Sequence, residues 1–203
     1  MPNWCETTYK VIGDEGEIKK LSEILESMSN EKKDDVSVSG FGGMWLGELV
    51  DRLGSDRKDE PCRGSIDDFH LETQDGGLRL RICMTTAWRE QEGVRHAIIR
   101  RFPRLEVYYQ DAEPGCDNYC TNDSDGKHFK ANYYYDSAKT TDEFIDYDSV
   151  RRQAMKDYGV ELPETYDDFG EVMGALRLFN EEHENDDDVY IDIHEVTRLG
   201  YDE

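Results

Sequence analysis

Residues 78–111 read LRLRICMTTAWREQEGVRHAIIRRFPRLEVYYQD, and this stretch decides the predicted fold. Apolar side chains occupy every second position of its first part, which is typical of a strand with one buried face: Leu78, Leu80, Ile82 and Met84. After Trp88 the apolar residues lie three or four positions apart, which predicts an amphipathic helix. Pro103 ends that helix because proline cannot continue it, and alternation resumes at Leu105 in a further strand.

Similar patterns precede this stretch. Residues 69–73 alternate in the same way, and the turn at residues 74–77 contains Asp-Gly, which accepts the positive φ angles of a tight hairpin. Residues 7–12 predict a first strand that Gly13 ends, and residues 15–28 carry a helical apolar stripe. The order strand, helix, strand, strand, helix, strand predicts a ferredoxin-like split β-α-β fold of the α+β class. In that fold two right-handed crossovers place both helices on one face of an antiparallel sheet.

The opposite face of the predicted sheet is polar. The side chains expected there are Lys10, His70, Glu72, Arg79, Arg81, Glu106 and Tyr108. Four of them are candidate binding residues for a ligand on an open sheet face: His70, Arg79, Arg81 and Tyr108. Mutual ion pairing under a covering segment explains the same pattern, so both interpretations stay open.

Two segments elaborate this domain. An insertion at about residues 36–64 contains a predicted short strand at 36–38 and a short amphipathic helix at 44–53. Residues 111–138 predict an elaborated hairpin with glycines at its turns. The predicted ferredoxin-like domain therefore extends over residues 1–139.

Residues 140–203 predict a C-terminal extension of two helices and a last strand. Asp148 is the expected N-cap of the first helix, and Gly159 lies just past its end. Thr165 and Asp168 have the spacing of a capping box at the start of the second. Because no repeat or low-complexity linker precedes the extension, we expect it to pack on the same domain.

The composition limits the classes of partner. The chain has 203 residues with 24 Lys and Arg against 47 Asp and Glu, a net charge of −23. Such a surface repels phosphate backbones, so we expect no direct binding of nucleic acid. The same charge favours a basic protein partner, or simply keeps the protein in solution. The sequence predicts no oligomeric state.

Location and redox state are predicted from what the chain contains. No basic and then apolar leader opens it, and no apolar run approaches the roughly 18 residues of a membrane span. A cytoplasmic protein without membrane association is therefore expected. The five cysteines are an odd number, which fits reduced thiols better than a disulfide framework.

The best candidate for a metal ligand set is Cys116 and Cys120 with His128 nearby. Structural zinc takes four thiolate or imidazole ligands, and two to four residues usually separate the members of a pair. A second clear pair is missing, so two loop cysteines without a metal are the alternative to a zinc site.

The tryptophans are predicted core anchors, because each indole is large enough to organise a small core. Trp4 and Trp88 flank the central strands, and Pro103 fixes the end of the helix. Trp88 is expected to be wedged where strand gives way to helix. Its replacement by alanine would then cost about 3–5 kcal/mol.

Several short motifs occur together in a recognisable order: Asn3-Trp4-Cys5, Gly13, Thr86-Ala87-Trp88 and Phe102-Pro103. They resemble the YubB-like proteins, an uncharacterised family with a ferredoxin-like domain that is carried on conjugative plasmids, phages and genomic islands. The likeness covers roughly residues 1–135 and departs at Arg89-Glu90, where prolines are usual, and in the Cys116–Cys120 segment. It implies the fold and a mobile-element setting, and it brings no catalytic residue.

No recognisable catalytic motif is present: the glycines at 40–43 lack a following Lys-Ser or Lys-Thr, and no Gly-x-Ser-x-Gly occurs. The first hypothesis is therefore a non-catalytic acidic interaction protein of a phage or other mobile element, which binds a host protein or a protein of the element through its acidic surface. A sharper version is a nucleic-acid mimic, which requires carboxylates at phosphate-like spacings; interspersed acids and bases would count against it. The alternative is a small-ligand or metal-binding domain that uses the open sheet face or the Cys116–His128 loop.

Overall fold

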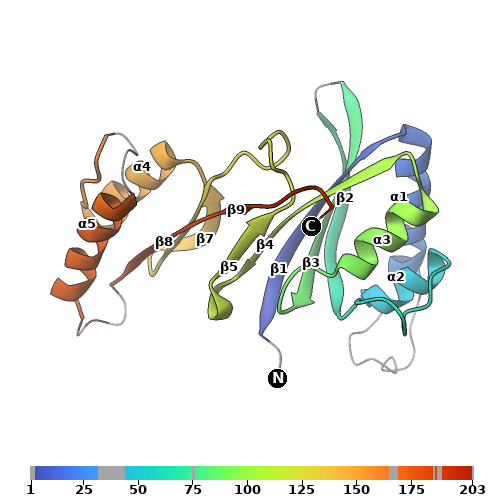
Figure 1. Ribbon diagram of the computed structural model, residues 1–203, viewed down its shortest axis with the longest axis horizontal. Coiled ribbons are helices and arrows are strands. Elements are labelled where there is room, and N and C mark those ends of the chain that lie inside the picture. Colours follow the sequence, from blue (N-terminus) through green and yellow to red (C-terminus); the bar gives the residue numbers. More distant parts are fainter. Residues whose placement is uncertain are drawn as a thin grey trace. The chain divides into compact units, whose positions relative to one another are not determined.

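The computed structural model describes residues 3–31, 44–74, 76–164, 169–184, 186 and 189–202. The fold is α+β, as predicted, and it divides into two compact units (Figure 1). The first unit comprises Met1–Ser124 with Leu199–Glu203, and the second comprises Asp125–Arg198. Within the described ranges, every helix is too short or too polar to cross a membrane.

The first unit is built on an antiparallel sheet with the strand order β2-β3-β1-β4-β5. The strands are β1 (Trp4–Gly13), β2 (Gly64–Gln74), β3 (Gly77–Ala87), β4 (Leu105–Glu113) and β5 (Asn118–Thr121). The order of the first four strands is that of the split β-α-β fold, which confirms the prediction. Antiparallel pairing of β2 with β3 is confirmed as well, although Asp75 of their turn lies outside the described residues.

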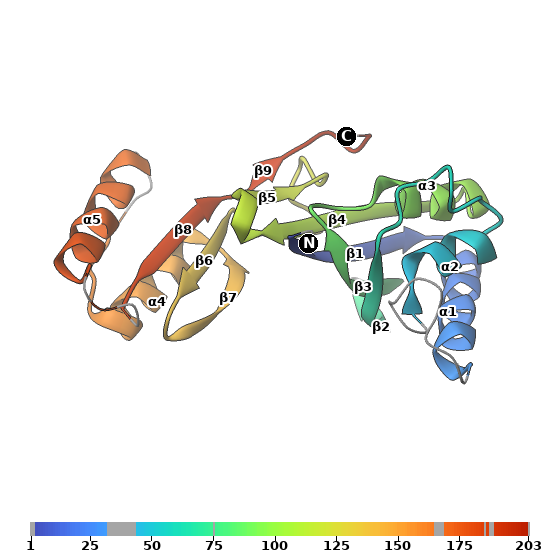
Figure 2. The same cartoon turned by 90° about the horizontal axis from the view of Figure 1, so that it is seen from below.

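Three helices belong to this unit: α1 (Glu15–Asn30), α2 (Leu46–Arg52) and α3 (Glu92–Arg101). They lie on the same side of the sheet (Figure 2). α1 begins where Asp14 caps it, since the Asp14 carboxylate accepts a hydrogen bond from the Glu17 N–H at 3.0 Å. Gly13 precedes the cap with a φ of 127°, and a Cβ there would lie 2.2 Å from the Arg104 carbonyl oxygen.

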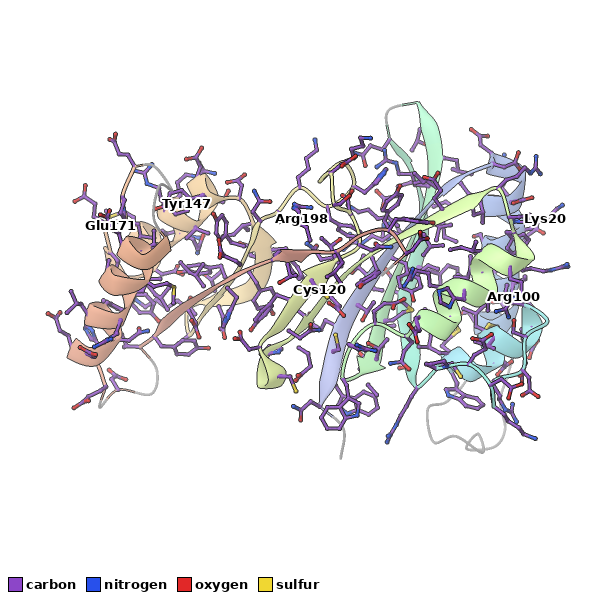
Figure 3. All side chains as sticks on the ribbon, in the orientation of Figure 1. Lys20, Arg100, Cys120, Tyr147, Glu171 and Arg198 are labelled. Carbon is purple, nitrogen blue, oxygen red and sulfur yellow. The ribbon has the colours of Figure 1, made fainter. Side chains whose placement is uncertain are left out.

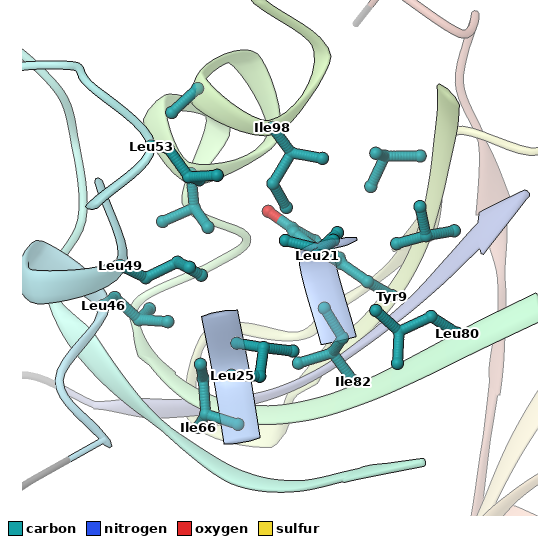
Figure 4. Close-up of a cluster of buried hydrophobic side chains, with 14 of the residues drawn as sticks. Tyr9, Leu21, Leu25, Leu46, Leu49, Leu53, Ile66, Leu80, Ile82 and Ile98 are labelled. Atoms are coloured by element: carbon teal, nitrogen blue, oxygen red, sulfur yellow. The ribbon is translucent and has the colours of Figure 1, made fainter. Parts of the chain in front are cut away.

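The core of the first unit lies between the sheet and these helices (Figure 4). The central strands β1 and β3 bury alternate side chains, while the helices bury their apolar stripes. Fully buried members include Tyr9, Leu21, Leu25, Leu46, Leu49, Leu80, Ile82 and Ile98. The predicted inward orientation of Leu80 and Ile82 is thus confirmed. In the insertion, the predicted helix is α2, whereas the strand predicted at 36–38 lies outside the described residues.

The second unit has its own sheet and its own core. Its strands pair in the order β7-β6-β8, with β6 at Tyr133–Ser137, β7 at Thr140–Ile145 and β8 at Ile191–Glu195. The helices are α4 (Tyr147–Tyr158) and α5 (Phe169–Glu182), and a two-residue strand, β9, covers Thr197–Arg198. The buried cluster comprises Tyr133, Tyr135, Val150, Ala154, Leu162, Val172, Leu176, Ile191 and Ile193.

Three predictions about this part of the chain were wrong. The boundary at 139 falls inside the β6–β7 hairpin, where Tyr134 pairs with Phe144. The hairpin predicted over 111–138 is the shorter β4–β5 hairpin, because a 3₁₀ turn at Pro114–Cys116 already reverses the chain. Asp146, not Asp148, caps α4, since its carboxylate accepts from the Ser149 N–H at 2.8 Å. The capping box predicted at 165–168 lies outside the described residues.

The directly paired leucines of the β2–β3 hairpin allow a matched test of the core. Leu80 is fully buried on a central strand, whereas its partner Leu71 is 42% exposed on the edge strand β2. We expect Leu80→Ala to lower the free energy of unfolding by about 2–5 kcal/mol and Leu71→Ala by less than about 1 kcal/mol. Urea denaturation measures both, and equal losses would contradict the assigned burial.

Candidate functional site

A small cavity lies in the first unit, where β4 and β5 meet the loop between β3 and α3. We call it the acidic pocket. Its volume is about 150 Å³, the space of roughly five waters. The lining residues are Arg89, Glu90, Glu92, Tyr109, Asp111, Asn118, Cys120 and Leu199.

Asp111 forms one side of the acidic pocket and has no exposed surface. One carboxyl oxygen accepts a hydrogen bond from the Cys120 thiol at 2.9 Å, across the β4–β5 pair. Figure 3 labels Cys120 on β5. The other accepts from the backbone N–H of Glu90 at 2.8 Å. Burial raises the pKa of Asp111 despite these bonds, because the charged form loses its hydration.

Glu90 is the second buried acid of the pocket and is 8% exposed. Its Oε1 accepts from the Tyr9 hydroxyl and, at 3.3 Å, from Nε of Arg95. Burial raises the pKa of Glu90, and the nearby Asp111 raises it further, while Arg95 opposes both effects. The guanidinium of Arg95 therefore compensates the buried acids only in part.

Arg95 itself is 2% exposed and lies behind the pocket. It extends from α3, and its guanidinium carbon lies 5.5 Å from the centre of the Tyr109 ring. A second nitrogen of the group donates to the Tyr201 carbonyl oxygen at 3.2 Å. These contacts join the helix, the sheet and the C-terminal tail around one buried charge.

The nucleophilic groups of this region are not activated. Burial and the charge of Asp111 raise the pKa of Cys120, and burial raises the pKa of Cys5 to about 12. Burial also raises the pKa values of Tyr9 and Tyr109. Thiolate or phenolate chemistry needs a lowered pKa, so the arrangement is suited to binding by hydrogen bonds and charge.

The structure brings the predicted open-face residues together. His70 pairs with Arg81, Arg81 with Lys10, and Lys10 with Tyr108, so these side chains form one row across four strands. Burial lowers the pKa of Lys10, with a further contribution from Arg81.

Most of these open-face side chains also have partners within the face. The two ring nitrogens of His70 lie 3.5 Å from the carboxylates of Asp68 and Glu72. Arg79 donates to Gln74 at 2.7 Å. Tyr108 donates to Glu106 at 3.2 Å, and its ring packs against that of Tyr201 at a tilt of 58°, with centres 5.1 Å apart. Internal pairing therefore explains much of the row, and ligand binding there stays a prediction.

The three residues predicted to bind zinc have separate surroundings. Cys116 is exposed and accepts from the Asn3 amide at 3.5 Å, whereas Cys120 bonds to Asp111. His128 belongs to the second unit. Among the residues with described positions, no group of three or more His, Cys, Asp or Glu is arranged to hold a metal ion. The zinc prediction thus gains no support from this part of the chain.

The prediction of Trp4 and Trp88 as buried anchors was wrong. Trp88 is 50% exposed and Trp4 is 43% exposed. At the strand–helix junction the small Ala87 is buried, and the Trp88 N–H donates to the Asn3 carbonyl oxygen as the chain turns outward. Trp88 has a φ of 73°, which is strained for a bulky residue.

Pro103 ends α3 but is not a buried anchor of the core. It is exposed, and the apolar residue buried at this end of α3 is Phe102. The Phe102 N–H donates to the Ile98 carbonyl oxygen, which completes the helix before the proline stops it.

Sequence reasoning missed Glu90, Arg95 and Asp111. For Asp111 a signal was present, because extending the alternation of Leu105, Val107 and Tyr109 by one step places it on the buried face. Nothing comparable marks Glu90, which lies in a loop. Its burial depends on contacts with Tyr9 and Arg95 that only the folded chain creates.

Comparisons with known proteins do not identify the chain. No family model matches it, and no curated protein matches it. A crystal structure described as an unknown protein from Galdieria sulphuraria covers 95% of this chain and 98% of its own, at 13% identity and a TM-score of 0.27. A TM-score this low carries no argument, and the resemblance to the YubB-like proteins stays a prediction.

The exposure and backbone conformation of Trp88 lead to one prediction. Trp88→Ala should change the free energy of unfolding by less than about 1 kcal/mol, because the ring contributes little to the core. Trp88→Gly should be more stable than Trp88→Ala by about 1 kcal/mol, since glycine adopts a positive φ without strain. Chemical denaturation tests both. A decrease of about 3–5 kcal/mol in the free energy of unfolding of the alanine variant would instead support the prediction that Trp88 is a buried core residue.

The raised pKa of Asp111 leads to a prediction about pH. Between its unfolded pKa of about 3.9 and the higher folded value, the folded chain keeps a proton that the unfolded chain releases. This group therefore lowers stability as pH rises through that window. Asp111→Asn removes the titration, so its stability relative to the unmodified protein should improve as pH rises above about 4, until the folded pKa is passed.

Urea titrations at several pH values provide the measurement for Asp111→Asn. Glu106→Gln is the matched control, because Glu106 is an exposed carboxylate of the same strand. An equal trend in both variants would assign the effect to net charge instead of burial.

Proposed function

We propose that this chain is a non-catalytic interaction protein that binds a basic partner protein through its acidic surface. The net charge of −23 supports an attraction that extends over the surface. The observation that carries the proposal is the acidic pocket, where Glu90 and Asp111 are buried beside groups whose pKa values are shifted away from nucleophilic catalysis.

A cationic group is the natural complement of this pocket. Of the described residues that line it, three are acidic (Glu90, Glu92 and Asp111) and one, Arg89, is basic. Burial makes the ionised form of Glu90 and Asp111 unfavourable, as their raised pKa values indicate. An approaching cation would favour the ionised form of both carboxyl groups. Their ionisation would in turn strengthen the binding of the cation.

The surface ion pairs favour a general basic partner over mimicry of nucleic acid. Arg52 pairs with Glu31 and Glu48, and Arg104 pairs with Asp14 and Glu17. Bases interspersed with acids in this way do not form a continuous row of phosphate-like charges. The mobile-element setting and a host protein as partner are expectations that come from the YubB-like resemblance.

A capture experiment tests the proposal. The immobilised protein is incubated with a cell lysate at about 0.05 M salt and washed at about 0.5 M salt, with an unrelated protein of similar net charge as the control. We expect a defined set of basic proteins that the control does not retain and that high salt releases. Capture that matches the control, or a captured set without excess positive charge, would contradict the proposal.

A further inference from the structure

The acidic pocket has a buried floor and an exposed rim. Glu90, Tyr109 and Asp111 are each at most 8% exposed, whereas Arg89 and Glu92 are exposed. A ligand group that enters from the rim would therefore lose its water while the rest of its molecule stays outside. A side chain of a partner protein can bind in this way, because its end enters the pocket while the partner's backbone stays outside.

The floor has unused capacity to accept hydrogen bonds. Asp111 accepts from the Cys120 thiol and from the Glu90 N–H, and Glu90 lies beside it in the pocket. The Tyr9 hydroxyl and Nε of Arg95 both donate to Oε1 of Glu90. Among the described residues, Oε2 of Glu90 thus keeps its capacity for a further donor.

We propose that the acidic pocket receives one guanidinium group, the side-chain end of an arginine of the basic partner. This inference rests on the proposed function and identifies the group that the partner inserts. A guanidinium carries five N–H donors in one plane and pairs with carboxylates through two parallel hydrogen bonds. Glu90 and Asp111 both line the acidic pocket and offer their carboxylate oxygens to such a plane, whereas a compact ammonium concentrates its donors at one point.

Size and neighbouring groups agree with this ligand. The volume of about 150 Å³ holds a planar group of four heavy atoms with its adjoining methylenes. The exposed carboxylate of Glu92 at the rim adds a further negative charge beside the entrance.

The test is an NMR titration of the full chain with methylguanidinium, recorded through the backbone amides of the loop, β4 and β5. Urea is the matched control, because it is planar and of similar size but uncharged. We expect saturable shifts around Glu90 and Cys120 with methylguanidinium at a dissociation constant on the order of 1 mM, and none with urea. The absence of saturable shifts at the pocket, or equal shifts with urea, would overturn the inference.

Variants locate the site. Asp111→Asn should weaken methylguanidinium binding about tenfold, equivalent to about 1.4 kcal/mol, whereas Glu106→Gln on the same strand should leave it unchanged. Dispersed spectra confirm that each variant folds. If Asp111→Asn does not fold, Glu92→Gln at the rim is used, with an expected loss of about threefold. Unchanged binding in the folded variant would overturn the assignment.

The two proposals fail in different ways. If methylguanidinium saturates the pocket but the capture experiment retains no basic proteins, the proposed function is wrong. The assignment of the pocket as a guanidinium site is then still supported. If basic proteins are captured in a salt-sensitive manner but methylguanidinium leaves the pocket resonances unshifted, the site is wrong and the function remains.

Discussion

The buried ion pair between Arg95 and Glu90 is the constraint on which the rest of the first unit depends. Burial of two such charges costs several kcal/mol per ion unless each finds close partners. Arg95 finds them in Glu90, in the Tyr201 carbonyl and in the face of the Tyr109 ring, and Tyr9 completes the set by donating to Glu90. Arg95 therefore connects α3 with β4, with the loop that carries Glu90 and with the C-terminal tail. Glu90 extends this connection to β1 through Tyr9.

This network also creates the acidic pocket. Because Glu90 is held by Tyr9 and Arg95, its backbone N–H points at Asp111 and the loop closes over the end of β4. The apolar core occupies the space between the sheet and the helices, and the polar network occupies this end. A charged ligand can change the protonation of this buried polar network, whereas an apolar core has no ionisable groups that a ligand could affect.

The second unit also holds a buried acid, Asp157, and its pKa shifts in the opposite direction. Burial would raise the pKa of Asp157, but hydrogen bonds lower it below its usual range. The donors are Tyr135, Ser137, Thr140 and Gln153. The hydrogen bonds to Asp111 do not outweigh burial, and its pKa is raised. The difference between the two acids lies in burial: Asp111 has no exposed surface, whereas Asp157 is 9% exposed and keeps more of its hydration.

The sequence by itself determined the strands and helices of the first unit and the outward row that His70 and Tyr108 share, because side-chain periodicity follows from local backbone geometry. Tertiary structure decided the remainder. The exposure of Trp88 depends on which residues fill the strand–helix junction, and the second core at residues 125–198 depends on pairing between distant strands. The acidic pocket likewise combines residues far apart in the chain, as Tyr9 and Glu90 show, and periodicity carries no information about such contacts.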